Sequence, residues 1–363
     1  MNSNLRKLLF VVSAICGVFA SGSTAFGAPT LDKTTVIIRA NTYSQWDSKA
    51  NTDKYGWVPQ LDFKVNGPVP SGSVISFEMT TPDGKPWVSA DCETSAVADG
   101  EVLKIEACGR DLQKNKMLWT AAVGMFGVKI SIKNELQGIN QNFFNGKFKV
   151  SKIFYGDVPN DKNNYAWYVD YDWALPIAEL YPDAIEQTYG GPQVKDAQPL
   201  VATFWFRGSE ANATAYLFHD GQQIGSTENT SLGMAVGEQG VELIEKANVP
   251  IAWIKNKYIF THVLVTNREK NGSHGDAFRL DKNPGEYEVK VLRKGKLVRT
   301  VKFTVGSNGR IVDPGITQQN ALGTQRITVF ASVAGDEDGR KPDLAAWKST
   351  AFFGEPLKGF GNN

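Results

Sequence analysis

The chain has 363 residues, of which 39 are Lys or Arg and 38 are Asp or Glu, so its formal net charge at pH 7 is +1. This balance excludes a strongly basic protein of the kind that binds nucleic acids or anionic membranes through its net charge. The length is that of about two domains.

Residues 1–27 have the pattern of a secretory signal peptide. Arg6 and Lys7 precede an apolar run, and Ala25 and Gly27 supply the small residues before a cleavage site. The apolar run is shorter than the roughly 20 residues that cross a bilayer. We therefore expect export to the periplasm or the extracellular space, a mature chain that starts near Ala28, and no membrane span.

Cys92 and Cys108 are the two cysteines that follow the leader. In an oxidising compartment, an even pair that closes a short loop is expected to form a disulfide. The pair lacks the C-x-x-C spacing and the nearby histidine of a metal site or a catalytic thiol. The sequence therefore predicts a disulfide, with no metal and no cofactor.

The first predicted domain follows an N-terminal segment. Residues 28–57 are predicted to contain a strand at 34–42 and then an irregular loop. Residues 58–174 alternate short apolar runs with Pro, Gly and Ser, which predicts a β-sandwich domain. Its closing strand is expected at 165–173, where alternate residues share one aromatic face: Tyr165, Trp167, Val169, Tyr171 and Trp173. Such a row favours a buried packing face over a sugar-stacking platform.

The rest of the chain is divided in the same way. Residues 175–199 are rich in proline and are predicted to be an ordered linker, with a short helix near 182–188. Residues 200–306 are predicted to be a second β-sandwich domain. Residues 307–363 form a C-terminal extension that contains a strand at 326–333.

Residues 284–305 carry the clearest strand pattern. Apolar residues alternate on both sides of the turn sequence RKGK, which predicts an antiparallel hairpin built on Tyr287, Val289, Val291, Val301, Phe303 and Val305. The pattern resembles the closing hairpin of bacterial immunoglobulin-like and fibronectin-like sandwiches. This resemblance implies an all-β fold of two antiparallel immunoglobulin-like sandwiches in tandem, and it implies no activity.

Collinear matches between the two predicted domains indicate an internal repeat. Asp83-Gly84 corresponds to Asp220-Gly221. Further along, 118–134 resembles 251–267 and 145–153 resembles 283–291.

The chain lacks the sequence motifs of phosphate-binding loops, zinc proteases and serine hydrolases. His219, His262 and His274 are scattered, so no catalytic triad is predicted. Asp170 and Asp172 raise the alternative of a carboxylate pair for glycoside hydrolysis, but a polar strand edge explains them equally. The acidic loops at 157–161 and 335–340 are predicted to be solvated turns, with calcium binding as the alternative.

Two modules without a catalytic constellation predict an exported, non-catalytic interaction or structural protein of the cell envelope or surface. It is expected to bind a protein partner through sandwich loops or edge strands. The alternative is a carbohydrate-binding protein that uses exposed aromatic residues, the candidates being Trp46, Trp57, Trp87 and Trp167. The third hypothesis is a hydrolase with a site between the two domains.

Overall fold

The computed structural model of the chain describes residues 28–49, 51–154, 165–182, 198–207, 213–227, 238–245, 253–265, 278–322, 326–334, 342–354 and 356–360. The predicted signal peptide, both acidic loops, His274 and residues 183–188 of the helix expected near 182–188 lie outside these residues. The described residues form strands β1 to β18, several 3₁₀ turns and one short α-helix, α1 (Ile316–Gln319). The predicted all-β class is confirmed.

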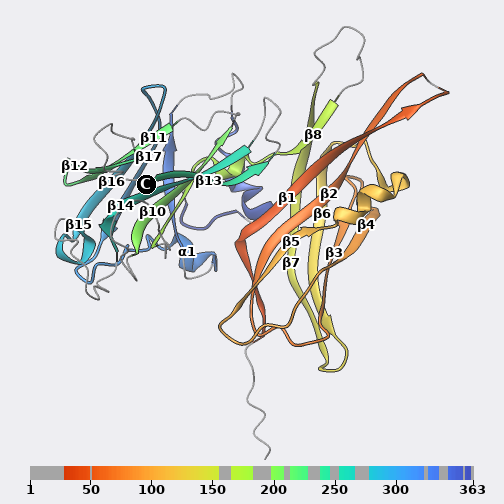
Figure 1. The fold of residues 1–363 in the computed structure, drawn as a ribbon, viewed down its shortest axis with the longest axis horizontal. Coiled ribbons are helices and arrows are strands. Elements are labelled where there is room, and N and C mark those ends of the chain that lie inside the picture. The colour runs from red at the N-terminus through yellow and green to blue at the C-terminus, as the bar shows by residue number, and fades with distance from the viewer. Residues whose placement is uncertain are drawn as a thin grey trace, which may run out of the picture.

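The first half of the molecule packs two antiparallel sheets against each other (Figure 1). One sheet has the order β1-β2-β5, made by β1 (Thr30–Asp47), β2 (Thr52–Asn66) and β5 (Val102–Cys108). The other has the order β4-β3-β6-β7-β8, made by β3 (Val74–Thr80), β4 (Pro86–Cys92), β6 (Gly124–Asn134), β7 (Ile139–Phe154) and β8 (Tyr165–Val169). The predicted closing strand at 165–173 corresponds to β8, which lies at the edge of this sheet.

The second half is a ten-stranded sheet that curls into a nearly closed, barrel-like form. Its strands are β9 (Ile177–Pro182), β10 (Pro199–Arg207), β11 (Ala213–His219), β12 (Gln222–Ser226), β13 (Glu238–Glu245), β14 (Trp253–Leu264), β15 (Phe278–Arg279), β16 (Gly285–Arg293), β17 (Lys296–Val305) and β18 (Ile327–Val333). The curl brings β12 next to β14. The closeness is seen at Gly225 of β12, where an added Cβ would lie 3.3 Å from the ring of Phe260 in β14. The two faces of the curl enclose one apolar core, to which Phe204, Leu217, Tyr258 and Val289 belong.

The predicted hairpin at 284–305 is confirmed. β16 and β17 pair antiparallel, and the apolar residues that alternate in the sequence are buried. Lys294 and Gly295 at the turn have positive φ, of 50° and 73°. Paired positive φ values match the twist of a two-residue hairpin turn, which explains why the turn contains glycine.

Three expectations about the chain's division need correction. Residues 43–57, predicted to be an irregular loop, belong mostly to the long antiparallel ribbon of β1 and β2. Residues 177–182, placed in the linker, form β9 in the middle of the second sheet. β18, placed in the C-terminal extension, joins β17 to β9. The sheets therefore form a half-barrel and a nearly closed barrel-like body, without a clear match to two immunoglobulin-like sandwiches.

The internal repeat is preserved only locally. The two Asp-Gly turns join equivalent hairpins, β3–β4 and β11–β12, and Gly84 and Gly221 both have a φ of 82°. The neighbours of these hairpins differ. β3 pairs with β6, which lies in segment 118–134, whereas β11 pairs with β16, which overlaps segment 283–291 and not the matching segment 251–267. Sequence similarity between 118–134 and 251–267 therefore does not correspond to equivalent strand pairing.

The two halves meet in an aromatic contact. The ring of Tyr171, which follows β8, stacks on Trp205 of β10 with 5.1 Å between the ring centroids. Next to this stack, Arg207 lies 3.5 Å from the carboxylate of Asp172. These contacts place residues of both halves in one apolar core.

No helix within the described residues has the length and the apolar character needed to cross a bilayer.

Candidate functional site: the projecting end of the β1–β2 ribbon

The ribbon of β1 and β2 extends beyond the sheet to which it belongs. β5 pairs with β2 only over residues 61–66, whereas β1 and β2 stay paired as far as Asp47 and Thr52. In Figure 1 the end of this ribbon projects away from the first half and diverges from the start of β8. The outer part of the ribbon is therefore two-stranded.

One face of the ribbon continues from the core to the projecting end. Thr42, Ser44 and Trp46 lie opposite Trp57, Tyr55 and Asp53 in the antiparallel register. Because side chains alternate between the two faces of a strand, these six share one face. Trp57 is fully buried, Tyr55 is half-buried, and the exposed fraction of Trp46 is 56%.

The opposite face of the ribbon is covered by the segment that follows β5. Trp119 stacks on Tyr43 with 5.6 Å between the ring centroids. A Cβ on Gly56, which lies opposite Tyr43, would be 3.0 Å from the Cβ of Trp119. A glycine at this position lets the Trp119 side chain reach the ribbon backbone.

The direction of the backbone groups along β1 follows from two contacts. The hydroxyl of Tyr171 accepts from the amide of Ile38 at 2.9 Å and donates to its carbonyl at 2.8 Å, so both backbone groups of Ile38 point away from β2. On the other side of the ribbon, Trp57, opposite Thr42, exchanges backbone hydrogen bonds with Thr120. Since these directions alternate along a strand, Ser44 and Trp46 also present their N–H and C=O groups to the outer edge of β1.

A second group of aromatic residues lies at the same end of the first half, on β7 and β8. Phe154 and Tyr165 are cross-strand partners with 5.7 Å between their ring centroids. Thr42 Oγ1 accepts a hydrogen bond of 3.0 Å from the amide of Trp167, and Ile38 contacts Tyr171, so β8 runs antiparallel to β1.

The four candidate stacking residues have different environments. Trp57 and Trp167 have exposed fractions of 0% and 2% and belong to the core. Trp87 is half-buried, donates to the carbonyl of Leu118 at 2.9 Å, and contacts Trp57 edge to face. Trp46 is the only one of the four that is exposed. The aromatic row at 165–173 is largely a packing face, as the sequence favours.

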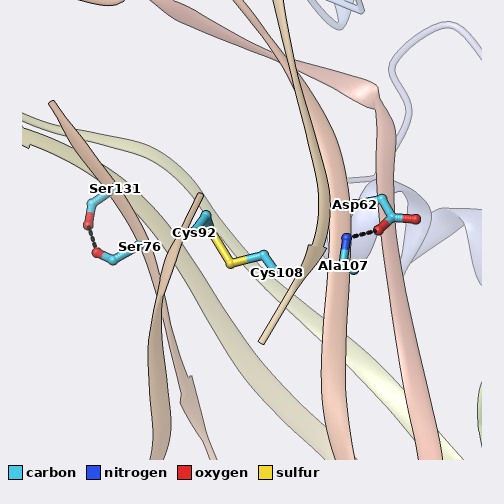
Figure 2. Close-up of a disulfide and its surroundings, with 6 residues drawn as sticks. All are labelled: Asp62, Ser76, Cys92, Ala107, Cys108 and Ser131. Carbon is cyan, nitrogen blue, oxygen red and sulfur yellow. Dashed lines mark hydrogen bonds between the residues drawn. A yellow bond between two sulfur atoms is a disulfide. The ribbon is translucent and has the colours of Figure 1, made fainter. Parts of the chain in front are cut away.

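The predicted disulfide between Cys92 and Cys108 is confirmed, with 2.09 Å between the sulfur atoms. Figure 2 shows that it joins β4 to β5, the edge strands of the two sheets of the first half. Ala107, which precedes Cys108, has a φ of 52° and donates its amide to Asp62 Oδ1 at 2.7 Å. The disulfide therefore connects the sheets on the side opposite to the contact between β1 and β8.

The carboxylates considered for hydrolysis have structural partners. Asp170 lies 3.6 Å from Lys149, and Asp172 accepts from the amide of Asp343 at 3.0 Å. Asp172 is not on the predicted strand face, because β8 ends at Val169 and a 3₁₀ turn starts at Asp172. Burial, with the nearby charge of Asp170, raises the pKa of Asp172. Next to these carboxylates, the ring of Tyr171 contacts the rings of Trp205 and Trp253.

The histidines that the structure describes lie apart. His219 is at the end of β11 and packs against Tyr287, whereas His262 is in β14. Burial, with the charge of Asp220, raises the pKa of Tyr287. Within the described residues, no three His, Cys, Asp or Glu side chains gather in a group that could hold a metal ion.

Sequence reasoning did not find the ribbon as a site. Ser44, Asp47, Asn51 and Gly56 are turn formers, and their density suggested a loop. The alternation of Thr42, Ser44 and Trp46 with the intervening residues is a weak strand signal that continues from the predicted strand.

Comparison with models of known protein families and with curated protein sequences finds no match for this chain.

Proposed function

We propose that this chain is an exported, non-catalytic binding protein of the cell envelope or surface, which contacts a protein partner through the projecting end of the β1–β2 ribbon. The observation that carries this proposal is the exposed Trp46 on a two-stranded ribbon whose outer edge presents backbone donors and acceptors. Trp is among the residues most enriched at the energetic centres of protein interfaces. An unpaired strand edge adds the hydrogen bonds by which another chain is held.

Two further features support export. The first 27 residues have the pattern of a leader, and the Cys92–Cys108 disulfide fits an oxidising compartment. The disulfide also makes the first half a fixed support for the ribbon, because it joins the sheet that contains β2 to the opposing sheet.

A photo-crosslinking residue placed at position 46 in the native host tests the proposal. Leu136, which is 93% exposed in the turn before β7, is the matched control at the opposite end of the first half. We expect a discrete crosslinked protein with the probe at position 46 and none with the probe at position 136. Absence of a crosslink at position 46, or the same products at both positions, would refute the proposal.

Carbohydrate recognition is the second candidate, because the accessible ring of Trp46 could stack on the face of a sugar. Retention of the protein on an insoluble polysaccharide, lost in Trp46→Ala and kept in Leu136→Ala, would favour this candidate. Equal retention of both variants would argue against it.

A further inference from the structure

We propose that the edge of β1 at Ser44 and Trp46 pairs antiparallel with the same edge of a second copy of this chain, about a two-fold axis at Gln45. This inference rests on the proposed function, since it names the partner of the same ribbon. The juxtaposition that carries it is an exposed tryptophan beside outward-pointing backbone groups on a strand edge.

The first step is the state of these backbone groups. The amides and carbonyls of Ser44 and Trp46 point away from β2, and both residues are exposed. In the part of the chain that the structure describes, no hydrogen bond reaches these four groups. A strand edge of this kind is a template for pairing with another chain.

The second step is the contrast with the other edges of the first half. The inner part of the β1 edge is covered, because Tyr171 bonds both backbone groups of Ile38. β4 begins with Pro86 and ends in the disulfide. β5 carries the exposed ion pair of Lys104 with Glu106, 2.5 Å apart. Proline and charged side chains protect strand edges from pairing. Ser44, Gln45 and Trp46 supply neither.

The third step is self-complementarity. With the axis at Gln45, Ser44 of each copy lies opposite the other copy's Trp46, so that the outward-pointing backbone groups of both residues pair. Gln45 then lies opposite the second copy's Gln45, and Tyr43 lies opposite its Asp47. Asp47 is paired within its own ribbon to Lys54 at 2.5 Å, and no like charges face each other across the edge. The two Trp46 side chains then lie on the same face as diagonal neighbours, a spacing within reach of aromatic side chains, and such cross-strand contacts stabilise antiparallel pairs. An isologous two-fold contact is the commonest form of protein assembly.

The expected assembly is elongated. The two ribbons would form a four-stranded sheet in the order β2-β1-β1-β2, and the two bodies would extend in opposite directions. The contact is short, so its area should lie below the roughly 1,200 Å² of standard interfaces, and the dimer should dissociate on dilution.

Sedimentation velocity of the full-length protein, as processed by its host, tests the inference over a wide concentration range. We expect the average mass to rise towards that of two copies, with at least tenfold weaker association in Trp46→Ala and in Ser44→Pro. The amide of Ser44 points away from β2, so proline there removes no hydrogen bond within the ribbon. Unchanged circular dichroism and melting temperature would verify the fold, and Leu136→Ala is the control that should still associate.

A single species of one-copy mass at all concentrations would overturn the inference. A dimer whose stability is the same in Trp46→Ala and Ser44→Pro would also overturn it, because the contact would then lie elsewhere. The photo-crosslinker at position 46 separates this failure from that of the proposed function. A crosslink to a different protein, with the purified chain monomeric, refutes the second copy alone, whereas no crosslink in cells or in purified protein refutes both.

Discussion

Glu179 of β9 and Lys255 of β14 are charged residues that the fold buries next to each other. The Glu179 carboxylate lies 2.8 Å from Lys255 Nζ and 2.7 Å from Arg326 Nη1, and its side chain is 4% exposed. Burial by itself would raise the pKa of Glu179, but the two cations outweigh it, so the pKa is lowered. Neutralising or removing a buried carboxylate that has such partners strongly destabilises the folded state.

We expect Glu179→Gln to lower the free energy of unfolding at pH 7 by about 3 kcal/mol. Because the pKa of Glu179 is lower in the folded state than in the unfolded state, its contribution is present above the ordinary value of 4.5 and is lost as the pH falls through the folded pKa. Urea unfolding between pH 7 and pH 3 checks both points, since the variant should lose less stability than the wild type on acidification. Glu78→Gln, which alters an exposed pair with Lys129, should change stability by less than about 1 kcal/mol. Equal effects of the two substitutions would contradict the argument.

At the scale of elements, the first half depends on how its two sheets are joined. β1 lies beside β8 on one side, through Thr42 and Trp167, and the disulfide joins β4 to β5 on the other. β5 bends next to the disulfide, and Gly109 has a φ of 87° at a point where a Cβ would lie 2.9 Å from the ring of Phe77. This side of the half-barrel is therefore closed by a covalent bond and a closely packed turn.

Removing the disulfide in the double variant Cys92→Ala, Cys108→Ala should lower the free energy of unfolding by about 3 kcal/mol, by the loop-entropy model for a sequence separation of 16. Thermal unfolding followed by circular dichroism measures this loss. Reduction of the wild type with a thiol should produce a similar shift and should leave the double variant unaffected. A reductant effect of the same size in both proteins would show that the disulfide is not its cause.

Whole-molecule behaviour depends on the contact between the halves. Trp205 and Trp253 of the second half belong to the core of the first, where they contact Tyr171. From the C-terminal segment, Phe353 also packs against Tyr171 with 5.8 Å between the ring centroids. The two halves therefore share buried surface, and separating them would expose aromatic side chains.

We predict a single calorimetric unfolding transition whose midpoint falls in Trp205→Ala, with a loss of about 3 kcal/mol in the free energy of unfolding. Trp46→Ala removes an exposed ring and should change this free energy by less than about 0.5 kcal/mol. Two separate transitions in the wild type, with only one of them shifted by Trp205→Ala, would mean that the halves unfold independently.

Features that depend on residues close together in the chain could be read from the sequence. Alternation around a glycine turn is a local property, so the all-β class and the β16–β17 hairpin could be predicted, and the two cysteines that follow the predicted leader leave one intramolecular pairing. Which of the four candidate tryptophans is exposed, and the pairing of β9 with β18 in the second sheet, depend on the folded chain. The same holds for the edge of β1 at Ser44 and Trp46, whose backbone groups receive no hydrogen bond from the residues that the structure describes. These properties arise from contacts between residues far apart in the chain. The burial of Trp57 and Trp167 and the exposure of Trp46 follow from what packs against them, which no local pattern records.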